Sequence, residues 1–265
     1  MELPILDGFY NSKCYLTAEK CVVNRNQFAK DYIAEHNIKT AILVFNRNLE
    51  NEPEKFGQAV KIGELQSGED FHGLYVIDNI LLTLPFVGNP NASATLEELK
   101  ALGIRNFLAA GSAGLIDEDF DDEKFLVVNR AIRDEGGSLH YEKPSLYAYT
   151  NEDVTLKILE VFNKKKIPYE LGTTWTFDSF YKESKARIEK RLSEGATAVE
   201  MECATWCVVA EKLGLKFGQF LYFSDKVADG DWSRKGGDMD DHLNVKDNIT
   251  FLCLEIAKKI DRENK

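Results

Sequence analysis

Hydrophobic positions recur along the chain in two spacings, and the two spacings alternate. Short apolar runs typical of buried strands cover residues 39–45, 106–110 and 216–223. Segments with apolar residues every three or four positions lie between them and predict amphipathic helices. The predicted helices cover residues 26–36, 91–102, 182–193, 202–213 and 248–260, and another carries Leu156 and Phe162. The remaining features are a strongly apolar run at 75–84, a tight turn at 111–114 and extended segments at 123–128 and 169–174.

Strands separated by helical crossovers predict a mostly parallel, mixed central sheet covered by helices on both faces. No Pro/Gly/Ser-rich linker, repeat or low-complexity tract interrupts the alternation. We therefore expect one three-layer α/β domain over residues 1–265. The acidic, glycine-rich segment 228–241 is predicted to be the most mobile loop, in a position that suits a lid.

Composition and charge narrow the possible partners. Hydrophobic residues make up 44% of the 265-residue chain, enough for a sizeable core. The formal net charge of -11 argues against a nucleic-acid partner, because such proteins carry basic patches. No apolar run approaches the roughly 20 residues of a membrane span, and no secretory signal is recognised. Five scattered cysteines predict free thiols in a reducing, cytoplasmic compartment.

Acidic residues follow two of the apolar runs. Glu200 and Glu202 come after the strand-like segment 197–199, and Asp225 comes after 220–223. Ligands of open α/β sheets bind beyond the carboxyl ends of the strands. These acids are therefore the first candidates for chemistry.

Glu200 and Glu202 have two interpretations that the sequence leaves open. Paired carboxylates bind vicinal hydroxyls, because each oxygen accepts a hydrogen bond and a diol offers two donors. Alternatively, the two acids simply favour the dipole at a helix N-terminus. Asp225 is likewise either a general acid with a pKa raised by its aromatic neighbours or a turn cap formed with Ser224.

Two further segments are candidates for contacts with a ligand. Phe180 and Tyr181 either form a stacking wall for a planar ring or pack in the core. Gly111 and Ser112 either hold an anion or a sugar hydroxyl, or form an ordinary turn. The four histidines lack metal-ligand spacing, so no metal site is predicted, and no phosphate-binding or dinucleotide-binding glycine motif occurs.

Six short segments, in chain order, resemble motifs of the nucleoside phosphorylase superfamily, which includes purine nucleoside phosphorylases, uridine phosphorylases and methylthioadenosine/adenosylhomocysteine nucleosidases. The matches span about residues 86–227. The matched segments are 88–93 (GNPNAS), 97–103 (EELKALG), 111–114 (GSAG), 178–181 (DSFY), 198–204 (AVEMECA, close to VEME-x-A) and 224–225 (SD).

The resemblance implies a role for each matched position. Glu202, with Met201 and Glu200, would bind the ribose. Phe180 and Tyr181 would pack against the base, and Asp225 would protonate or hydrogen-bond N7 of a purine. The 111–112 pair would touch phosphate or the attacking water.

Purine is favoured over uracil, because uridine phosphorylases carry a Gln and an Arg shortly after the Phe-Tyr pair. Ser184 and Ala186 stand at those offsets here. The phosphate-binding positions of the family also depart from the pattern. The Arg two residues before the 111–114 motif is replaced by Ala109, and the N-terminal phosphate loop has no clear counterpart. Arg25 is the only cation near that loop's expected place, and Arg47 is a possible replacement.

The resemblance implies cleavage of an N-glycosidic bond by a transferase that converts a purine nucleoside and phosphate into free base and ribose 1-phosphate, as in nucleoside catabolism and salvage. Hydrolysis by water and non-catalytic nucleoside binding or storage are the alternatives, because Ala109 weakens the phosphate site. Phosphate would be a co-substrate, and no other cofactor is expected. The family also implies a homo-oligomer, either a dimer or a hexamer.

Overall fold

Residues 3–228, 231–234 and 239–262 are described by the structure, a computed structural model. The strands are β1 (Thr40–Val44), β2 (Val60–Ser67), β3 (Asp70–Ile77), β4 (Ile80–Thr83), β5 (Asn106–Leu115), β6 (Phe125–Asp134), β7 (Tyr147–Tyr149), β8 (Tyr169–Phe177), β9 (Ala196–Glu200), β10 (Lys216–Ala228) and β11 (Asp231–Arg234). The α-helices are α1 (Ala18–Cys21), α2 (Gln27–Glu35), α3 (Asn48–Asn51), α4 (Asn89–Leu102), α5 (Glu152–Lys165), α6 (Lys185–Ser193), α7 (Cys203–Leu213) and α8 (Met239–Arg262). Short 3-10 helices are η1 (Pro4–Leu6), η2 (Pro53–Phe56), η3 (Gly137–His140) and η4 (Phe180–Lys182).

All described strands join one mixed sheet. Strands β4, β1, β5 and β10 pair in parallel, as do β6, β8 and β9. Antiparallel pairings of β10 with β6 and of β5 with β9 connect these two blocks and close a ring of five strands. Antiparallel pairs also add β2, β3, β7 and β11 at the margins.

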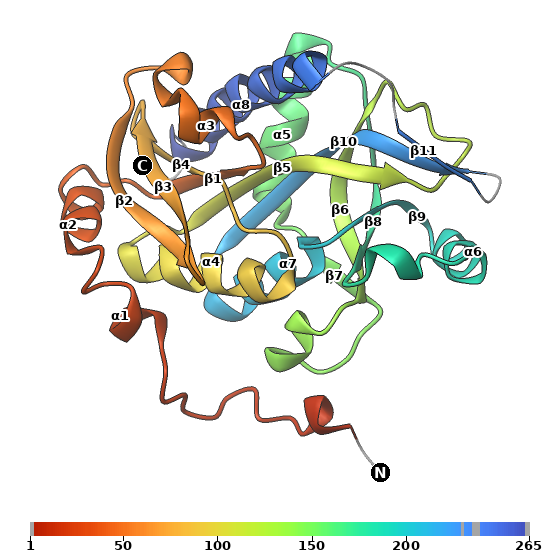
Figure 1. Ribbon diagram of the computed structural model, residues 1–265, viewed down its shortest axis with the longest axis horizontal. Coiled ribbons are helices and arrows are strands. Elements are labelled where there is room, and N and C mark those ends of the chain that lie inside the picture. Colours follow the sequence, from red (N-terminus) through yellow and green to blue (C-terminus); the bar gives the residue numbers. More distant parts are fainter. Residues whose placement is uncertain (1–2, 229–230, 235–238, 263–265) are drawn as a thin grey trace.

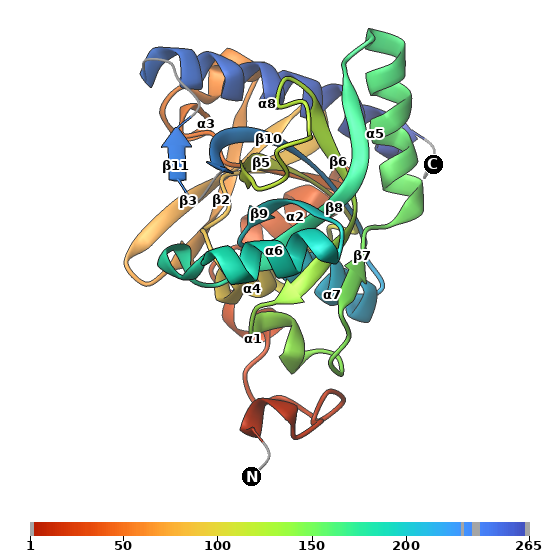
Figure 2. The same ribbon diagram turned by 90° about the vertical axis from the view of Figure 1, so that its right-hand side faces the viewer.

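Helices cover the sheet on both faces (Figures 1 and 2). On β1, Ala41 and Leu43 pack toward the core that includes α2, α4 and α7, whereas Ile42 and Val44 pack toward the core that includes α5 and α8. This alternation follows from the two-residue period of a strand. The expected α/β class, with a mixed sheet between helix layers, is confirmed.

The strands that lead to the candidate chemistry are longer than the sequence predicted. Residues 111–114 were expected to form a turn after 106–110, but they continue β5 to Leu115. The reason is tertiary pairing, because β10 also continues past the predicted 216–223 and pairs with this part of β5, for example Tyr222 with Ser112. Paired backbone groups on both strands make the extended form stable despite the glycines.

The apolar run at 75–84 is divided between the antiparallel strands β3 and β4. Asp78 and Asn79, with φ of 51° and 66°, form the turn between them. Asp and Asn adopt this left-handed conformation more readily than other non-glycine residues.

Part of the predicted lid segment 228–241 is regular structure. Residues 231–234 form β11, which pairs with β10, and residues 239–241 begin α8. Residues 229–230 and 235–238 lie outside the described residues, so the lid prediction is untested there. No helix in the described ranges is long and apolar enough to cross a membrane.

Candidate active site

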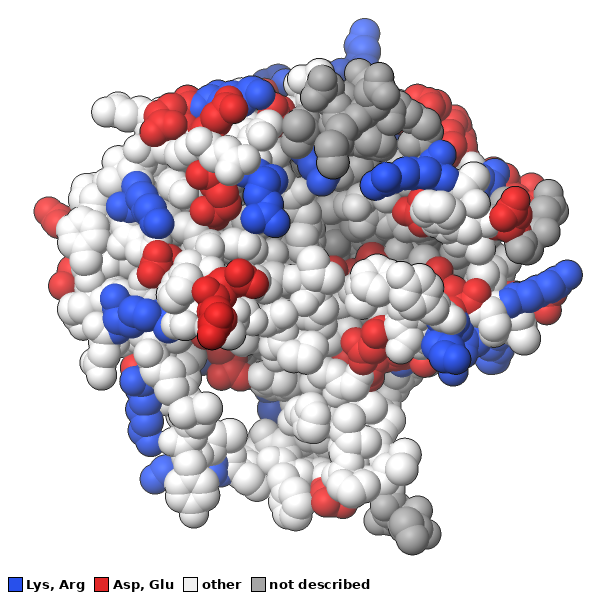
Figure 3. Space-filling model, in the orientation of Figure 1, with Lys and Arg blue, Asp and Glu red and all other residues white. Residues whose placement is uncertain are grey.

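A pocket of about 460 Å³ lies at the carboxyl ends of β5, β9 and β10, and its volume is in the range of small-molecule sites. Figure 3 shows the face on which the molecule is hollowed right of its centre, with charged side chains nearby. Of the candidates from the sequence, the pocket is lined by Arg47, Ser112, Phe180, Glu200, Met201, Glu202 and Asp225.

Glu200 ends β9 and is fully engaged by the protein. Its Oε2 accepts hydrogen bonds from the backbone N–H groups of Glu202 and Cys203, at 2.8 and 2.7 Å. Its Oε1 accepts from the Thr176 hydroxyl at 2.5 Å. Glu200 thus caps the N-terminus of α7, and its two oxygens already have protein partners. Burial nevertheless raises the pKa of this carboxyl above its ordinary value, to about 6.

Glu202, in contrast, keeps an acceptor for a ligand. It is only 5% exposed, and its Oε1 accepts a hydrogen bond from the N–H of Gly88 at 2.6 Å. Gly88 precedes α4 with a φ of 93°, a conformation that favours glycine. The backbone N–H of Met201 is a second hydrogen-bond donor to this carboxylate. Burial, and then the charge of Glu200, raise the pKa of Glu202.

The two interpretations of the acid pair therefore each apply to one residue. Glu200 serves the helix N-terminus, and Glu202 faces the pocket with Met201 beside it. Glu200 also lines the pocket, but its oxygens already accept hydrogen bonds from the protein, so Glu202 is the better placed of the two acids for a sugar contact.

Asp225 lies within β10 and not in a turn, so the capping interpretation does not apply. Its Oδ1 accepts from the Ser224 hydroxyl at 2.7 Å, and its Oδ2 accepts from the indole N–H of Trp232 on β11 at 3.1 Å. Both donors hold the carboxyl in a fixed orientation.

Phe180 lines the pocket but Tyr181 does not. The Tyr181 side chain is 98% exposed, which contradicts its predicted place in the site and also excludes core packing. Phe180 is 63% exposed, so its ring lies at the mouth of the pocket. Glu183, three residues further along, also lines the pocket and was missed in the sequence, where it is one of many acids.

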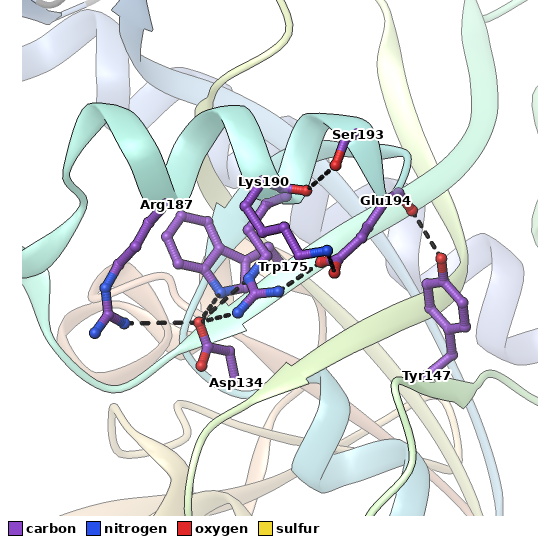
Figure 4. Close-up of polar contacts among 8 residues, drawn as sticks. Asp134, Tyr147, Trp175, Arg187, Lys190, Ser193 and Glu194 are labelled. Atoms are coloured by element: carbon purple, nitrogen blue, oxygen red, sulfur yellow. Dashed lines mark hydrogen bonds and ion pairs between the residues drawn. The ribbon is translucent and has the colours of Figure 1, made fainter.

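Helix α6, which follows this segment, is anchored away from the pocket. Asp134 at the end of β6 accepts hydrogen bonds from Trp175 Nε1 at 3.0 Å and Arg191 Nη2 at 2.9 Å. Figure 4 shows Arg187 reaching toward the same carboxylate, at 3.8 Å. The Arg187 guanidinium also lies 4.9 Å from the centre of the Phe177 ring. Arg187 is thus held outside the pocket.

Gly111 and Ser112 sit on β5 beside the pocket. Only Ser112 lines it, and its side chain is exposed there. A Cβ on Gly111 would lie 2.9 Å from the Phe45 ring, so the glycine allows Phe45 to cross close to the strand. Gly111 therefore shapes the site without touching a ligand through a side chain.

Arg47 and Lys246 enter the pocket from opposite ends of the sequence. The buried Asn46 and Asn48 donate hydrogen bonds to the Asp247 carboxylate at 2.9 and 3.1 Å, and Lys55 pairs with it at 2.5 Å. Asp247 is thereby fixed to the loop after β1, which brings its neighbour Lys246 into the pocket that Arg47 lines. Burial and the charges of Arg234 and Arg47 lower the pKa of Lys246. Within the described residues, no acid forms an ion pair with Arg47 or Lys246.

Arg25 and Ala109 lie elsewhere. Arg25 donates a hydrogen bond to Gln66 on β2 and does not reach the pocket, so its predicted role in the phosphate region is wrong. Ala109 is fully buried in the core between the sheet and α4. Lys246 was missed because no local pattern in the sequence links it to Arg47. In the part of the chain that is described, no group of three or more His, Cys, Asp or Glu side chains forms a metal site.

The family model described as "Phosphorylase superfamily" matches residues 43–257, and the chain belongs to this family. Among known proteins, the chain is similar to the guanosine phosphorylase of Halorubrum lacusprofundi, with 28% identity over 62% of this chain and 68% of that protein. It is also similar to the uridine phosphorylase of Thermococcus kodakarensis, with 30% identity over 52% of this chain and 55% of the relative. The match thus spans little more than half of that uridine phosphorylase.

A solved structure of a futalosine hydrolase mutant of Helicobacter pylori has a similar fold. The TM-score is 0.65 at 21% identity, and the superposition covers 83% of this chain and 99% of the other. This likeness concerns the fold alone.

Proposed function

We propose that this protein cleaves the N-glycosidic bond of a purine nucleoside by phosphorolysis, releasing the free base and ribose 1-phosphate. Membership of the phosphorylase superfamily and similarity to guanosine and uridine phosphorylases support this class of reaction. The observation that carries the proposal is that one pocket holds a buried acceptor, Glu202, and two cations, Arg47 and Lys246, that form no ion pair with an acid among the described residues.

Glu202 is the proposed ribose contact. Its carboxylate accepts a hydrogen bond from a sugar hydroxyl, while the N–H of Gly88 fixes one of its oxygens. The bond-breaking transition state has a cationic, oxocarbenium-like sugar. A buried carboxylate beside that sugar stabilises the developing charge more than it stabilises the neutral substrate. Met201 supplies the apolar side of the sugar site.

Arg47 and Lys246 are the proposed phosphate contacts. Two cations that face one pocket without acidic partners favour an anion, and charge-assisted hydrogen bonds to phosphate are among the strong ones. Ser112 adds a hydroxyl donor from β5. These residues would replace the arginine that the family places where Ala109 stands, and would hold phosphate for attack on C1′.

The base end of the pocket supports a purine. Phe180 offers a stacking face, and the carboxyls of Asp225 and Glu183 offer groups that assist a purine ring nitrogen. Neither Gln nor Arg reaches this end among the described residues that line the pocket, because Arg187 is bound to Asp134. The groups that would read a uracil edge are thus not placed there.

Hydrolysis is the second candidate, and one observation favours it. Ala109 leaves β5 without a cation, so the anion end depends on side chains from a loop and a helix. Attack by a neutral water molecule on C1′ would not need a cation at this end of the pocket.

A single assay separates the candidates. The protein is incubated with inosine, guanosine, adenosine, uridine and methylthioadenosine, with and without phosphate, and base release is followed by chromatography. We expect phosphate-dependent release from a purine nucleoside together with ribose 1-phosphate. Equal release without phosphate would establish hydrolysis instead. Binding of a nucleoside without release under either condition would contradict both enzymatic proposals.

A further inference from the structure

Glu183 is a carboxyl in the pocket that has no hydrogen-bond or ion-pair partner among the described residues. It follows η4, is partly buried and lines the pocket beside Phe180. Within the described ranges, no amide, hydroxyl or cation donates a hydrogen bond to it or pairs with it. A partly buried polar group without a partner is unfavourable, so such a group in a pocket points to a ligand.

Asp225 faces the same pocket from β10 but differs in its contacts. Ser224 and Trp232 each donate a hydrogen bond to one of its oxygens, so both oxygens of Asp225 act as acceptors. Glu183 has neither donor. Of the two acids, Glu183 is thus the one whose environment favours carrying a proton.

The electrostatic surroundings agree with this difference. Burial, and then the charge of Asp225, raise the pKa of Glu183 to about 7. The other charged groups that line the pocket are Glu200 and Glu202 from the β9–α7 junction, Arg47 after β1 and Lys246 on α8. A general acid is most effective when its pKa lies near the working pH.

We propose that Glu183 is the general acid that protonates the leaving base, and that Asp225 is the fixed negative charge that keeps Glu183 protonated. This inference rests on the proposed nucleoside cleavage. The Glu183 proton passes to N7 of a purine stacked on Phe180, and the electron pair of the C1′–N9 bond moves into the base. An oxygen of phosphate forms the new bond to C1′. The Glu183 carboxylate is then reprotonated by the proton that the attacking hydrogen phosphate releases as it becomes the ribose 1-phosphate dianion.

The test compares a purine nucleoside with its N7-methyl derivative, for example inosine and 7-methylinosine. The methylated base already carries the positive charge that protonation would supply, so it needs no acid. We expect Glu183→Gln to reduce kcat/KM for inosine by about 100-fold, the range of a lost general acid, and for 7-methylinosine by less than about threefold. A merely structural defect would reduce both.

The pH profile supplies a second readout. Wild-type kcat/KM for inosine should fall above about pH 7, as Glu183 loses its proton, and Glu183→Gln should lack this limb. Asp225→Asn should move the limb to lower pH, because the charge that raises the pKa of Glu183 is removed. Glu189→Gln, on the exposed side of α6, is the matched control and should behave as wild type.

Three outcomes would overturn the assignment. Equal losses on both nucleosides in Glu183→Gln would show a structural role. Full activity of this variant on inosine, with a selective loss in Asp225→Asn, would make Asp225 the acid. A wild-type protein that cleaves neither nucleoside, with or without phosphate, would contradict the proposed function itself and this inference with it.

Discussion

The sugar end and the anion end of the pocket use the same arrangement with opposite charges. At each end, one carboxylate is fully bonded within the protein and a nearby residue has an unpaired charge. Glu200 accepts bonds from the start of α7, and Glu202 faces the pocket. Asp247 accepts bonds from Asn46 and Asn48, and its neighbour Lys246 faces the pocket. At each end, a carboxylate that is hydrogen-bonded within the protein thus fixes the position of a nearby charged residue that faces the pocket.

The two ends differ in how the chain builds them. The sugar end is contained in one strand-to-helix junction, from Glu200 to Cys203. The anion end joins segments that are 201 positions apart, as the bond between Asn46 and Asp247 shows. A site built locally leaves a pattern in the sequence, whereas a site built by tertiary contact does not.

The charges of Glu202 and Lys246 should each reduce the stability of the folded protein. Burial and the charge of Glu200 raise the pKa of Glu202, while burial and neighbouring cations lower the pKa of Lys246. Both shifts mean that the charged form is disfavoured in the folded state. Under the proposed function, a nucleoside and phosphate would supply partners for these two charges.

The largest expected effect of breaking this arrangement is at the sugar end. Glu202→Gln removes the negative charge near the cationic sugar, and we expect kcat/KM to fall by about 100-fold, since a hydrogen bond to a charged group contributes about 1.5–3 kcal/mol. Base-release assays at saturating phosphate measure this.

The same variant should be more stable than wild type without ligand. Because the folded pKa of Glu202 is raised, its charge destabilises the folded state increasingly as pH rises above about 4.5, the ordinary value. The gain in Tm should therefore widen from pH 5 to pH 8. Glu211→Gln, exposed on the same helix, is the control. Unchanged turnover would remove Glu202 from the site.

The sequence predicted that Glu202 and Met201 would lie at the edge of the sheet where a pocket is found, and their contact with a sugar stays a prediction. Residues 199–202 stand where a strand meets a helix, and this local pattern placed Glu202 and Met201 in the pocket. The pattern did not reveal that Glu200 faces inward, because that depends on Thr176 of β8, which approaches only in the folded chain. The alternation of strands and helices likewise predicted the fold class but not the ring closed by β5, β9 and β10, since strand pairing is set by tertiary contacts.

The anion end was predicted only in part. Arg47 was a possible replacement for the missing arginine, and the structure places it in the pocket, whereas Arg25 lies against Gln66. Lys246 is one lysine among many in the sequence, and only the bonds to Asp247 bring it to the site. Glu183 was missed for the same reason, because its significance comes from facing Asp225.

The second-largest effect on catalysis is expected at the end of the pocket that holds Arg47 and Lys246. Lys246→Met removes one of the proposed phosphate contacts, and we expect KM for phosphate to rise about tenfold with little change in KM for the nucleoside. Initial rates over a grid of both substrates separate the two constants. Lys258→Met is the matched control on α8, where Lys258 pairs with Asp78. A selective rise in KM for the nucleoside would mean that Lys246 contacts the nucleoside and not phosphate.

The smallest effect on catalysis, and the one that tests the comparison most directly, is expected from Asp247→Asn. The variant should raise KM for phosphate only a fewfold, because Asp247 acts by holding Lys246 near Arg47. It should also lower Tm at pH 7, the opposite of Glu202→Gln.

Burial alone would raise the pKa of Asp247, but bonds from Lys55, Asn46 and Asn48 outweigh burial and lower it. The stabilisation by the charged form is therefore present above the ordinary value of about 4 and is lost as pH falls through the lower, folded value. Thermal denaturation of the variant and wild type should show a Tm difference that narrows below about pH 5, while Asp70→Asn at an exposed hairpin shows none. A Tm difference that is independent of pH would mean that Asp247 holds this end by shape and not by charge, and that the two ends of the pocket are not built alike.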